Sequence, residues 1–376
     1  MSRAQAVDGA ALTGPATFLE RLQVVKDALL LPFVIFVGLF RPENKARPFA
    51  RAVYDITIRY IAHRGWNIRQ WLFFLGARNS TEVYDAWARK NKMENLTDEF
   101  GLEGEEGGGA KLHWVGARSY ERVLIYCHGG AFCLPANQDQ HLGFLSAVKR
   151  ELEKAGKPTG VVFLPYSLAP FVPFPAQLRQ INAVVIHLLA KGASPSNIIL
   201  VGDSAGGNLT LQFLSHTLHP LPGIPAPPTL STPLAGALLI SPWVTFGTDY
   251  PSFKENDTVD NINQCTLDYM AGLVTPGVPP GQEQWFEPIK SDETWWHGLD
   301  GKVRRVMCTV GEFECLKDPI EEFSMTRLKP NVKDFSWLVE KNGTHIDFLC
   351  DFQVKEGGRG EPYWRVISWL TDTFQG

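Results

Sequence analysis

A serine set between glycines, directly after a short apolar run, is the feature that most constrains how this chain folds. The motif Gly-Asp-Ser-Ala-Gly-Gly at 202–207 follows the apolar run 197–201 and precedes a helix-like stretch at 205–217. Glycine on both sides of the serine lets a strand turn sharply into a helix without side-chain clashes. Such a turn lifts the serine hydroxyl to the carboxyl edge of a sheet. The motif therefore predicts a strand, a tight turn and a helix, with the Ser204 hydroxyl at the carboxyl edge of the sheet.

Short apolar runs alternate with helix-like segments along most of the remaining chain. The strand-like runs lie at 122–127, 160–166, 197–201, 235–240, 303–310 and 336–340, and helical spacing occurs at 142–154, 176–190 and 363–374. Strands that are apolar throughout are typical of a sheet buried on both faces. The sequence therefore predicts the α/β class, with a mainly parallel central sheet covered by helices. An insertion at about 243–300, rich in Trp, Asp and Pro, interrupts the alternation.

A second glycine pair follows the first of these predicted strands. His128, Gly129, Gly130 and Ala131 come directly after the run 122–127. Two adjacent glycines let the backbone curl so that its N–H groups point into a cavity. Together with the N–H of Ala205, those of Gly129 and Gly130 would stabilise an oxyanion. The alternative is an ordinary glycine turn in which His128 has a structural role.

These motifs together resemble the hormone-sensitive-lipase-like branch of the α/β-hydrolases. That branch carries an HGG(G/A) loop, a GDSAGG turn and, between them, a Y-R-L-A-P-E-x-P-F-P-A segment. Here 166–176 reads Tyr-Ser-Leu-Ala-Pro-Phe-Val-Pro-Phe-Pro-Ala, and Ser-Pro-Trp at 241–243 follows the next strand as in the branch. The resemblance covers about 112–376. It implies an α/β-hydrolase fold with Ser204 as the nucleophile, and N-terminal helices that help to build a cap over the acyl pocket.

A serine nucleophile needs a base, and in this fold the chain order is serine, acid, histidine. The histidines after Ser204 are His216, His219, His297 and His345. The first two lie on or just past the serine's own helix, and we expect them to face solvent, while His297 lies in the insertion. His345 follows the last predicted strand, which is the family's position for the base. The family usually has glycine next, whereas Ile346 follows here.

The resemblance also suggests the acid. The segment Gly-Glu-Phe-Glu-Cys-Leu-Lys-Asp at 311–318 matches the family's G/A-E-x-D-P-L-x-D. Glu314 falls on the catalytic position, where aspartate is commoner, and either carboxylate can orient an imidazole. Asp318 fits the second acidic position and is the reserve candidate. We expect structural roles for Glu312 and for Asp203, which would satisfy its own loop.

The N-terminal third of the chain lies outside the resemblance. Residues 16–92 read as mostly helical, and 101–110 form a Gly/Glu-rich loop. We therefore divide the chain into an N-terminal tail and helical cap region at 1–110 and a catalytic domain at 111–376, with the cap insertion at about 243–300. The segment 28–40 is uniformly apolar. As a helix it spans about 20 Å, against about 30 Å of bilayer hydrocarbon. This segment is consistent with a cap helix, an interfacial anchor or a membrane span. It also resembles the N-terminal apolar segment of membrane-associated esterases that deacetylate sterols.

Composition excludes some classes of partner and cofactor. The 376 residues carry a net charge of −4 without a basic block, which argues against nucleic-acid binding. Six scattered cysteines have neither metal-ligand spacing nor the pattern of a disulfide framework. We therefore expect no metal, no cofactor and a cytoplasmic location, with membrane association through 28–40 as a further option. The oligomeric state is not indicated.

The sequence thus predicts a serine carboxylester hydrolase of the esterase or deacetylase type. It would act on a small apolar ester through an acyl-enzyme on Ser204, with Glu314 and His345 as acid and base. One alternative is an acyltransferase or ring-forming enzyme of a natural-product pathway (secondary metabolism). Another is a non-catalytic small-molecule receptor on the same fold. The aromatic residues Trp285, Phe286, Trp295 and Trp296 would either line an apolar pocket or form the core of the cap.

Overall fold

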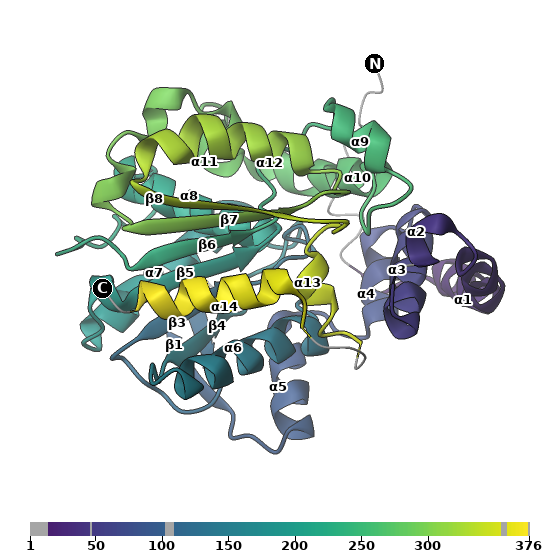
Figure 1. The fold of residues 1–376 in the computed structure, drawn as a ribbon, viewed down its shortest axis with the longest axis horizontal. Helices are drawn as coiled ribbons and strands as arrows, with labels where there is room; N and C mark the ends of the chain where they lie inside the picture. Colours follow the sequence, from purple (N-terminus) through teal and green to yellow (C-terminus); the bar gives the residue numbers. More distant parts are fainter. Residues whose placement is uncertain (1–13, 46, 102–108, 355–358, 375–376) are drawn as a thin grey trace.

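A mainly parallel sheet forms the centre of the molecule (Figure 1). The computed structural model describes residues 14–45, 47–101, 109–354 and 359–374. In these residues eight strands are arranged in the order β1-β2-β4-β3-β5-β6-β7-β8. Their bounds are β1 Leu96–Phe100, β2 Ala110–Trp114, β3 Val123–Cys127, β4 Gly160–Leu164, β5 Ile198–Asp203, β6 Gly236–Ile240, β7 Arg305–Gly311 and β8 Asp334–Glu340. The strands from β3 to β8 are parallel, and β1 and β2 are antiparallel to their neighbours. The predicted fold class is confirmed.

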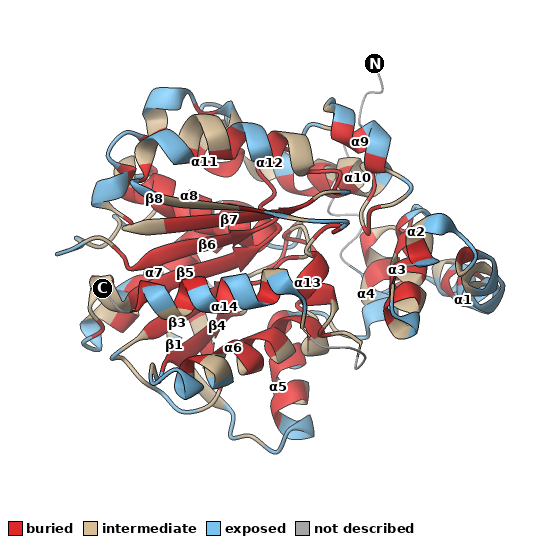
Figure 2. Ribbon diagram, in the orientation of Figure 1, coloured by how far each residue is buried: buried red, intermediate tan, exposed pale blue. Residues whose placement is uncertain are grey.

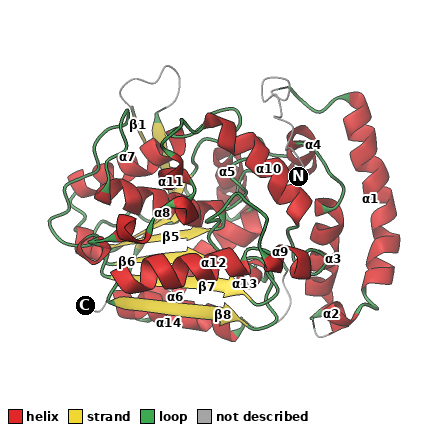
Figure 3. Cartoon of the chain, turned by 90° about the horizontal axis from the view of Figure 1, so that it is seen from above, coloured by secondary structure: helices red, strands yellow, loops and turns green. Residues whose placement is uncertain are grey.

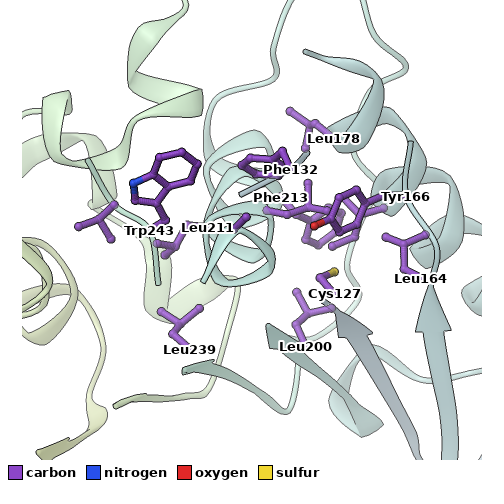
Figure 4. Close-up of a cluster of buried hydrophobic side chains, with 14 of the residues drawn as sticks. Cys127, Phe132, Leu164, Tyr166, Leu178, Leu200, Leu211, Phe213, Leu239 and Trp243 are labelled. Atoms are coloured by element: carbon purple, nitrogen blue, oxygen red, sulfur yellow. The ribbon is translucent and has the colours of Figure 1, made fainter. Parts of the chain in front are cut away.

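Helices cover both faces of this sheet (Figure 3). One face carries α7 (Ala176–Ala190) and α8 (Ala205–Leu218), and the other carries α6 (Gly143–Lys154) and α14 (Glu361–Thr373). Successive residues of β3 point to opposite faces, so that Ile125 and Leu124 belong to separate hydrophobic clusters. Figure 4 shows the cluster beneath α8, where Cys127 of β3 and Leu200 of β5 lie below Phe213. The apolar strand runs are explained by this burial on both sides.

Shorter helices follow β6, β7 and β8. They are α9 (Pro251–Asn256), α10 (Gln264–Val274), α11 (Glu283–Phe286), α12 (Lys317–Phe323) and α13 (Asp347–Cys350). Among them, α9, α10 and α13 lie near the carboxyl ends of the parallel strands (Figure 1). Helices α9 to α11 belong to the predicted insertion, which follows β6. The loop between α9 and α10 reaches the segments that follow β7 and β8. The insertion is therefore tied to the edge of the sheet where the predicted site residues lie.

One of the N-terminal helices, α5 (Ser80–Lys90), belongs to the same body as the sheet. The others are α1 (Phe18–Gly38), α2 (Pro42–Lys45), α3 (Phe49–Ala62) and α4 (Ile68–Leu75). Helix α5 packs with the cluster beneath α6, and its Tyr84 hydroxyl donates to the carbonyl of Trp114 at 2.8 Å. Strand β1 also precedes residue 111 and pairs with β2. The sheet-bearing body thus begins before the expected boundary at 110, and most of the loop expected at 101–110 lies outside the described residues.

Helix α1 stands at the outer edge of the molecule, and Figure 2 shows it almost entirely exposed. A capping box of Thr17 and Glu20 starts the helix, which continues through Pro32. Only Val24, Asp27 and Gly38 of α1 are buried. In the described residues, no helix combines the length and the apolarity that crossing a membrane requires. The apolar segment 28–40 therefore forms the second half of a helix that packs against α3 and α4 on one side and exposes its other side.

Candidate active site

Ser204 lies at a strained turn between β5 and α8. Its backbone has φ +52° and ψ −118°, a region that non-glycine residues rarely occupy and that costs about 1–3 kcal/mol. Neighbouring backbone holds this conformation, because the Ser204 N–H donates to the carbonyl of Ile240 at 2.8 Å and its carbonyl accepts from Trp243 at 3.0 Å. Gly206 permits the close approach of α8 to β3, since a Cβ there would collide with the carbonyl of Cys127. The predicted turn is present, with Ser204 8% exposed.

The structure brings His345 and Glu314 together. Glu314 lies in the turn after β7, and His345 lies in the loop between β8 and α13. The His345 Nδ1 is 2.7 Å from the Oε1 of Glu314, and both side chains are buried. The Oε2 of Glu314 accepts from the N–H of Gly311 and from the Ser241 hydroxyl, each at 2.8 Å. Ser241 begins the Ser-Pro-Trp motif, so this motif supports the acid.

Asp318, the reserve acid, does not share this arrangement. Its Oδ2 accepts from the N–H of Ser252 at 2.9 Å, at the start of α9. In the described part of the chain, no hydrogen bond or ion pair joins Asp318 to His345. Glu312 accepts from the N–H of Asn342 at 2.8 Å. Both carboxylates therefore hold loops in place, and Glu314 alone of the three contacts the imidazole.

The surroundings of His345 favour its charged form. Burial opposes the imidazolium and lowers the pKa, but the charge and the hydrogen bond of Glu314 act the other way. The charges of Asp260 and Asp203 add to this effect, and the net result is a raised pKa for His345. A histidine in such a place can take up a proton and hold it while its own charge is stabilised.

The glycine loop after β3 differs from its expected form in one respect. The N–H of Gly129 donates to the Asp203 carboxylate at 2.9 Å, so it is not free for an oxyanion. The left-handed φ of +114° at Gly130 and +53° at Ala131 turns the chain after it. Within the described residues, the N–H groups of Gly130, Ala131 and Ala205 have no acceptor. Gly129 is required instead for close approach, because a Cβ there would meet the Asp203 carboxylate.

His128 and Asp203 support this loop from beneath. Both side chains are fully buried. The His128 Nε2 pairs with the Ser80 hydroxyl at 2.8 Å, its ring stacks on Tyr166, and burial lowers its pKa to about 3. Tyr166, the first residue of the Tyr-Ser-Leu-Ala-Pro segment, donates its hydroxyl to the His128 carbonyl at 2.7 Å. Asp203 also accepts from the Tyr126 hydroxyl, at 2.5 Å. The motif histidine is therefore a neutral support for the loop.

Two groups of residues near His345 were not found from the sequence. Asp260, in the loop between α9 and α10, accepts from the backbone N–H of His345 at 2.7 Å. Asp347 accepts from Arg47 at 2.7 Å and from Arg51 at 2.6 Å, and it also binds the N–H of Thr344 at 3.1 Å. These contacts hold the loop in which Ile346 takes a φ of +51°, a conformation in which glycine is unstrained. The sequence indicated neither group, because the residues that form these contacts lie far apart along the chain.

The other predictions for polar and aromatic residues have mixed outcomes. His216 is fully buried, and the expectation that it faces solvent is wrong, because both faces of α8 are covered. Trp285 and Trp295 bond to the far end of α8, at His219 and Ser215, and Trp296 is fully buried. Trp285 and Trp296 belong to the core, and the half-buried Trp295 packs against it. All six cysteines are described and none is in a disulfide, and the described residues contain no cluster suited to a metal ion.

Comparison with known proteins identifies the family. The family model described as the alpha/beta hydrolase fold matches residues 124–349. The chain belongs to the α/β-hydrolase fold family. An acetyl-hydrolase of Streptomyces hygroscopicus is 30% identical to this α/β-hydrolase over 59% of the chain and 67% of the relative. A putative steryl acetyl hydrolase of Schizosaccharomyces pombe is 27% identical over 70% of each.

A solved structure agrees in fold with this α/β-hydrolase. An esterase from the bacterial hormone-sensitive lipase family superposes with a TM-score of 0.58 and 23% identity, over 95% of this chain and 99% of that one. The family model, the acetyl-hydrolase relative and this fold confirm the kinship with hormone-sensitive-lipase-like enzymes that the motifs suggested.

Proposed function

We propose that the protein is a serine carboxylester hydrolase that removes short acyl groups from apolar alcohols, with acetyl as the preferred group. The contact that carries the proposal is the one between the imidazole of His345 and the buried carboxylate of Glu314, at 2.7 Å. Because the catalytic serine of this fold precedes its acid and base in the chain, Ser204 at the strained turn is the matching nucleophile. Relatives named acetyl-hydrolase, esterase and arylacetamide deacetylase support hydrolysis of an acyl bond.

The proposed reaction has two halves. His345 takes the proton of the Ser204 hydroxyl while the serine oxygen bonds to the ester carbonyl carbon. The imidazolium then gives this proton to the leaving alcohol oxygen as the C–O bond breaks, which leaves an acyl-serine. Water attacks the acyl-serine in the same way, with His345 first accepting and then returning a proton, and the free acid departs. Glu314 holds the imidazole and stabilises its charge throughout.

Three backbone N–H groups are suited to the oxyanion that forms in each half. We assign this role to Gly130, Ala131 and Ala205, whose N–H groups have no acceptor in the described residues. Ala205 begins α8, so its N–H also lies at the positive end of the helix dipole. Ala131 takes the place that was predicted for Gly129, because Asp203 holds the Gly129 N–H.

A cluster of aromatic residues that borders the glycine loop and the first turns of α8 favours an apolar substrate. The Phe286 ring lies 5.5 Å from that of Phe132, 5.0 Å from that of Phe174 and 4.7 Å from that of Phe246, between ring centroids. The Asn208 amide, one turn of helix after Ser204, donates to the Phe286 carbonyl at 2.9 Å. Phe132 follows the glycine loop directly. An apolar group of the substrate would therefore meet rings instead of charges.

Ester cleavage with analysis of the products tests this function. We expect turnover of nitrophenyl esters to be fastest for acetate and to fall toward palmitate, with free acid as the product. The same reactions with an added apolar alcohol separate hydrolysis from acyl transfer. Formation of a new ester as the main product would contradict the proposal and favour a transferase. Ligand binding without turnover of any ester would favour a receptor.

We also infer that α1 lies against a lipid surface. Its exposed apolar side chains are Phe18, Leu19, Leu22, Val25, Leu29, Leu30, Phe33, Phe36 and Val37. At about 100° per residue these side chains form one face of α1, roughly 140° wide, opposite the buried Val24, Asp27 and Gly38. An amphipathic helix of this kind lies in the plane of a lipid surface with its apolar face among the acyl chains. Exposed Arg41 and Lys45 follow the helix, where they would meet anionic headgroups.

Sedimentation with vesicles of phosphatidylcholine and phosphatidylserine tests this contact. The double variant Phe33→Ser and Phe36→Ser should lower vesicle binding about tenfold or more, since each phenylalanine contributes about 1.5–3 kcal/mol on leaving water. Trp364→Ser, an exposed aromatic on α14, is the matched control and should bind as the wild type does. Equal binding by the double variant would contradict the inference. A wild-type dimer that the double variant converts to a monomer would show that a second copy covers α1.

A further inference from the structure

We propose that Asp260 is a positioning residue, which holds the acid and base loops of the active site in one arrangement. It belongs to the insertion between β6 and β7, in the loop that joins α9 to α10. Its role builds on the proposed hydrolase function, because the loops that it joins carry Glu314 and His345. Neither the motifs nor the family resemblance singled it out.

The carboxylate of Asp260 binds both loops at once. One oxygen accepts from the backbone N–H of His345 at 2.7 Å, and the other accepts from that of Cys315 at 2.7 Å. Cys315 directly follows Glu314 in the chain. The first oxygen also accepts from the N–H of Asn261 at 2.7 Å. Asp260 therefore fixes the distance between the two backbone segments from which the acid and the base project.

Two asparagines beside Asp260 strengthen the same connection. The Asn256 amide donates to the Glu314 carbonyl at 2.9 Å, and the Asn261 amide donates to the Thr344 hydroxyl at 2.8 Å. The loop between α9 and α10 thus reaches the acid loop at 314–315 and the base loop at 344–345. A carboxylate is the central member because it only accepts, and three N–H groups converge on it.

The fully buried charge of Asp260 also acts on the imidazole. The titratable or charged groups near Asp260 are Glu314 and the Cys315 thiol on the acid loop, His345 on the base loop and Arg59 on α3. Burial and the charge of Glu314 raise the pKa of Asp260, whereas the charge of His345 and the N–H donors from Cys315 and His345 favour the carboxylate. The charge of Asp260 in turn raises the pKa of His345. The side chain of Asp260 thus both positions the two loops and raises the pKa of His345.

Asp260→Asn separates this role from simple packing. The amide is the same size, but its NH₂ group must face a backbone N–H, so one of the two loops loses its partner. We expect kcat to fall about tenfold to a hundredfold, as small misplacements of catalytic groups do, with KM nearly unchanged. The acid limb of kcat/KM should move to lower pH, because a charge that raises the pKa of His345 has gone. The pKa of the His345 imidazole, measured by NMR titration, should fall as well. This measurement needs no turnover.

Two further variants make the test specific. Asp318→Asn makes the same change at a nearby carboxylate that accepts one backbone N–H, from Ser252, and it should leave the acid limb in place. Asp260→Glu keeps the charge, so it should retain the wild-type acid limb. Its kcat should fall, because the longer side chain displaces the two loops. This variant replaces Asp260→Asn in the test if Asp260→Asn does not fold. Wild-type kinetics and an unmoved His345 titration in Asp260→Asn would overturn the inference, as would a shifted limb in Asp260→Glu. Failure of the wild type to cleave esters would instead contradict the proposed function, and the NMR titration would still test Asp260.

Discussion

Ser204→Ala is expected to lower kcat for a nitrophenyl acetate by about 10⁶-fold, the scale seen when a serine hydrolase loses its nucleophile. The hydroxyl is the atom that forms the acyl-enzyme, and no neighbouring group can replace it in that step. Substrate binding should change little, because the aromatic cluster at Phe286 and the backbone N–H groups of the glycine loop remain. Initial rates at saturating ester, corrected for spontaneous hydrolysis, give the value.

A second serine on the same helix provides the control for this experiment. Ser215 is buried on α8 and accepts from the Trp295 indole at 2.8 Å, at the end of the helix away from the turn. Ser215→Ala should therefore keep kcat near that of the wild type. Strong activity in Ser204→Ala would mean that a different residue or a water attacks the ester, and the mechanism would have to be abandoned.

Glu314→Gln is expected to lower kcat by about 10⁴-fold, the cost when the carboxylate of such a triad becomes an amide. The carboxylate now accepts from three groups, the imidazole Nδ1, the Gly311 N–H and the Ser241 hydroxyl. The NH₂ group of a glutamine must face one of these donors. If it faces His345, the imidazole takes the wrong tautomer, and its Nε2 can no longer accept the serine proton. The stabilisation of the imidazolium is lost as well.

Asp318→Asn is the matched comparison for the acid. Its carboxylate lies four positions along the chain and also fits the family motif, but it caps the start of α9 through Ser252. We expect most of the activity to remain in this variant, measured with the same ester at the same pH. A large loss in Asp318→Asn together with a small one in Glu314→Gln would reverse the assignment of the acid.

The fold was predictable because its strands are apolar throughout and its turns carry distinctive motifs. Burial on both faces makes β3, β5 and β6 stand out in the sequence, and the glycines after β5 mark the turn at Ser204. Strand β1 was missed, since Leu96–Phe100 lies at the edge of the sheet and is half polar. His216 was misjudged because helix position alone does not reveal that α8 is covered on every side.

The site was predictable only as far as local motifs extend. The family resemblance suggested Glu314 as the acid and His345 as the base, in the loops after β7 and β8, and it left Asp318 open as the reserve acid. Asp260 was not predictable, because its partners lie 55 and 85 positions further along the chain. Likewise, Arg51 reaches Asp347 from α3 across 296 positions. The occupied N–H of Gly129 depends on the rotamer of Asp203, which no sequence pattern encodes.

Labelling of the purified protein with a fluorophosphonate, followed by mass spectrometry of the digested adduct, shows directly whether Ser204 is an activated nucleophile. The probe reacts with a serine only when an assembled base activates it, so it reports the proposed nucleophile without knowledge of the natural substrate. We expect one adduct, on the peptide that contains Ser204, and no such adduct in Ser204→Ala. An unlabelled wild type, or an adduct on another residue that persists in Ser204→Ala, would contradict this expectation.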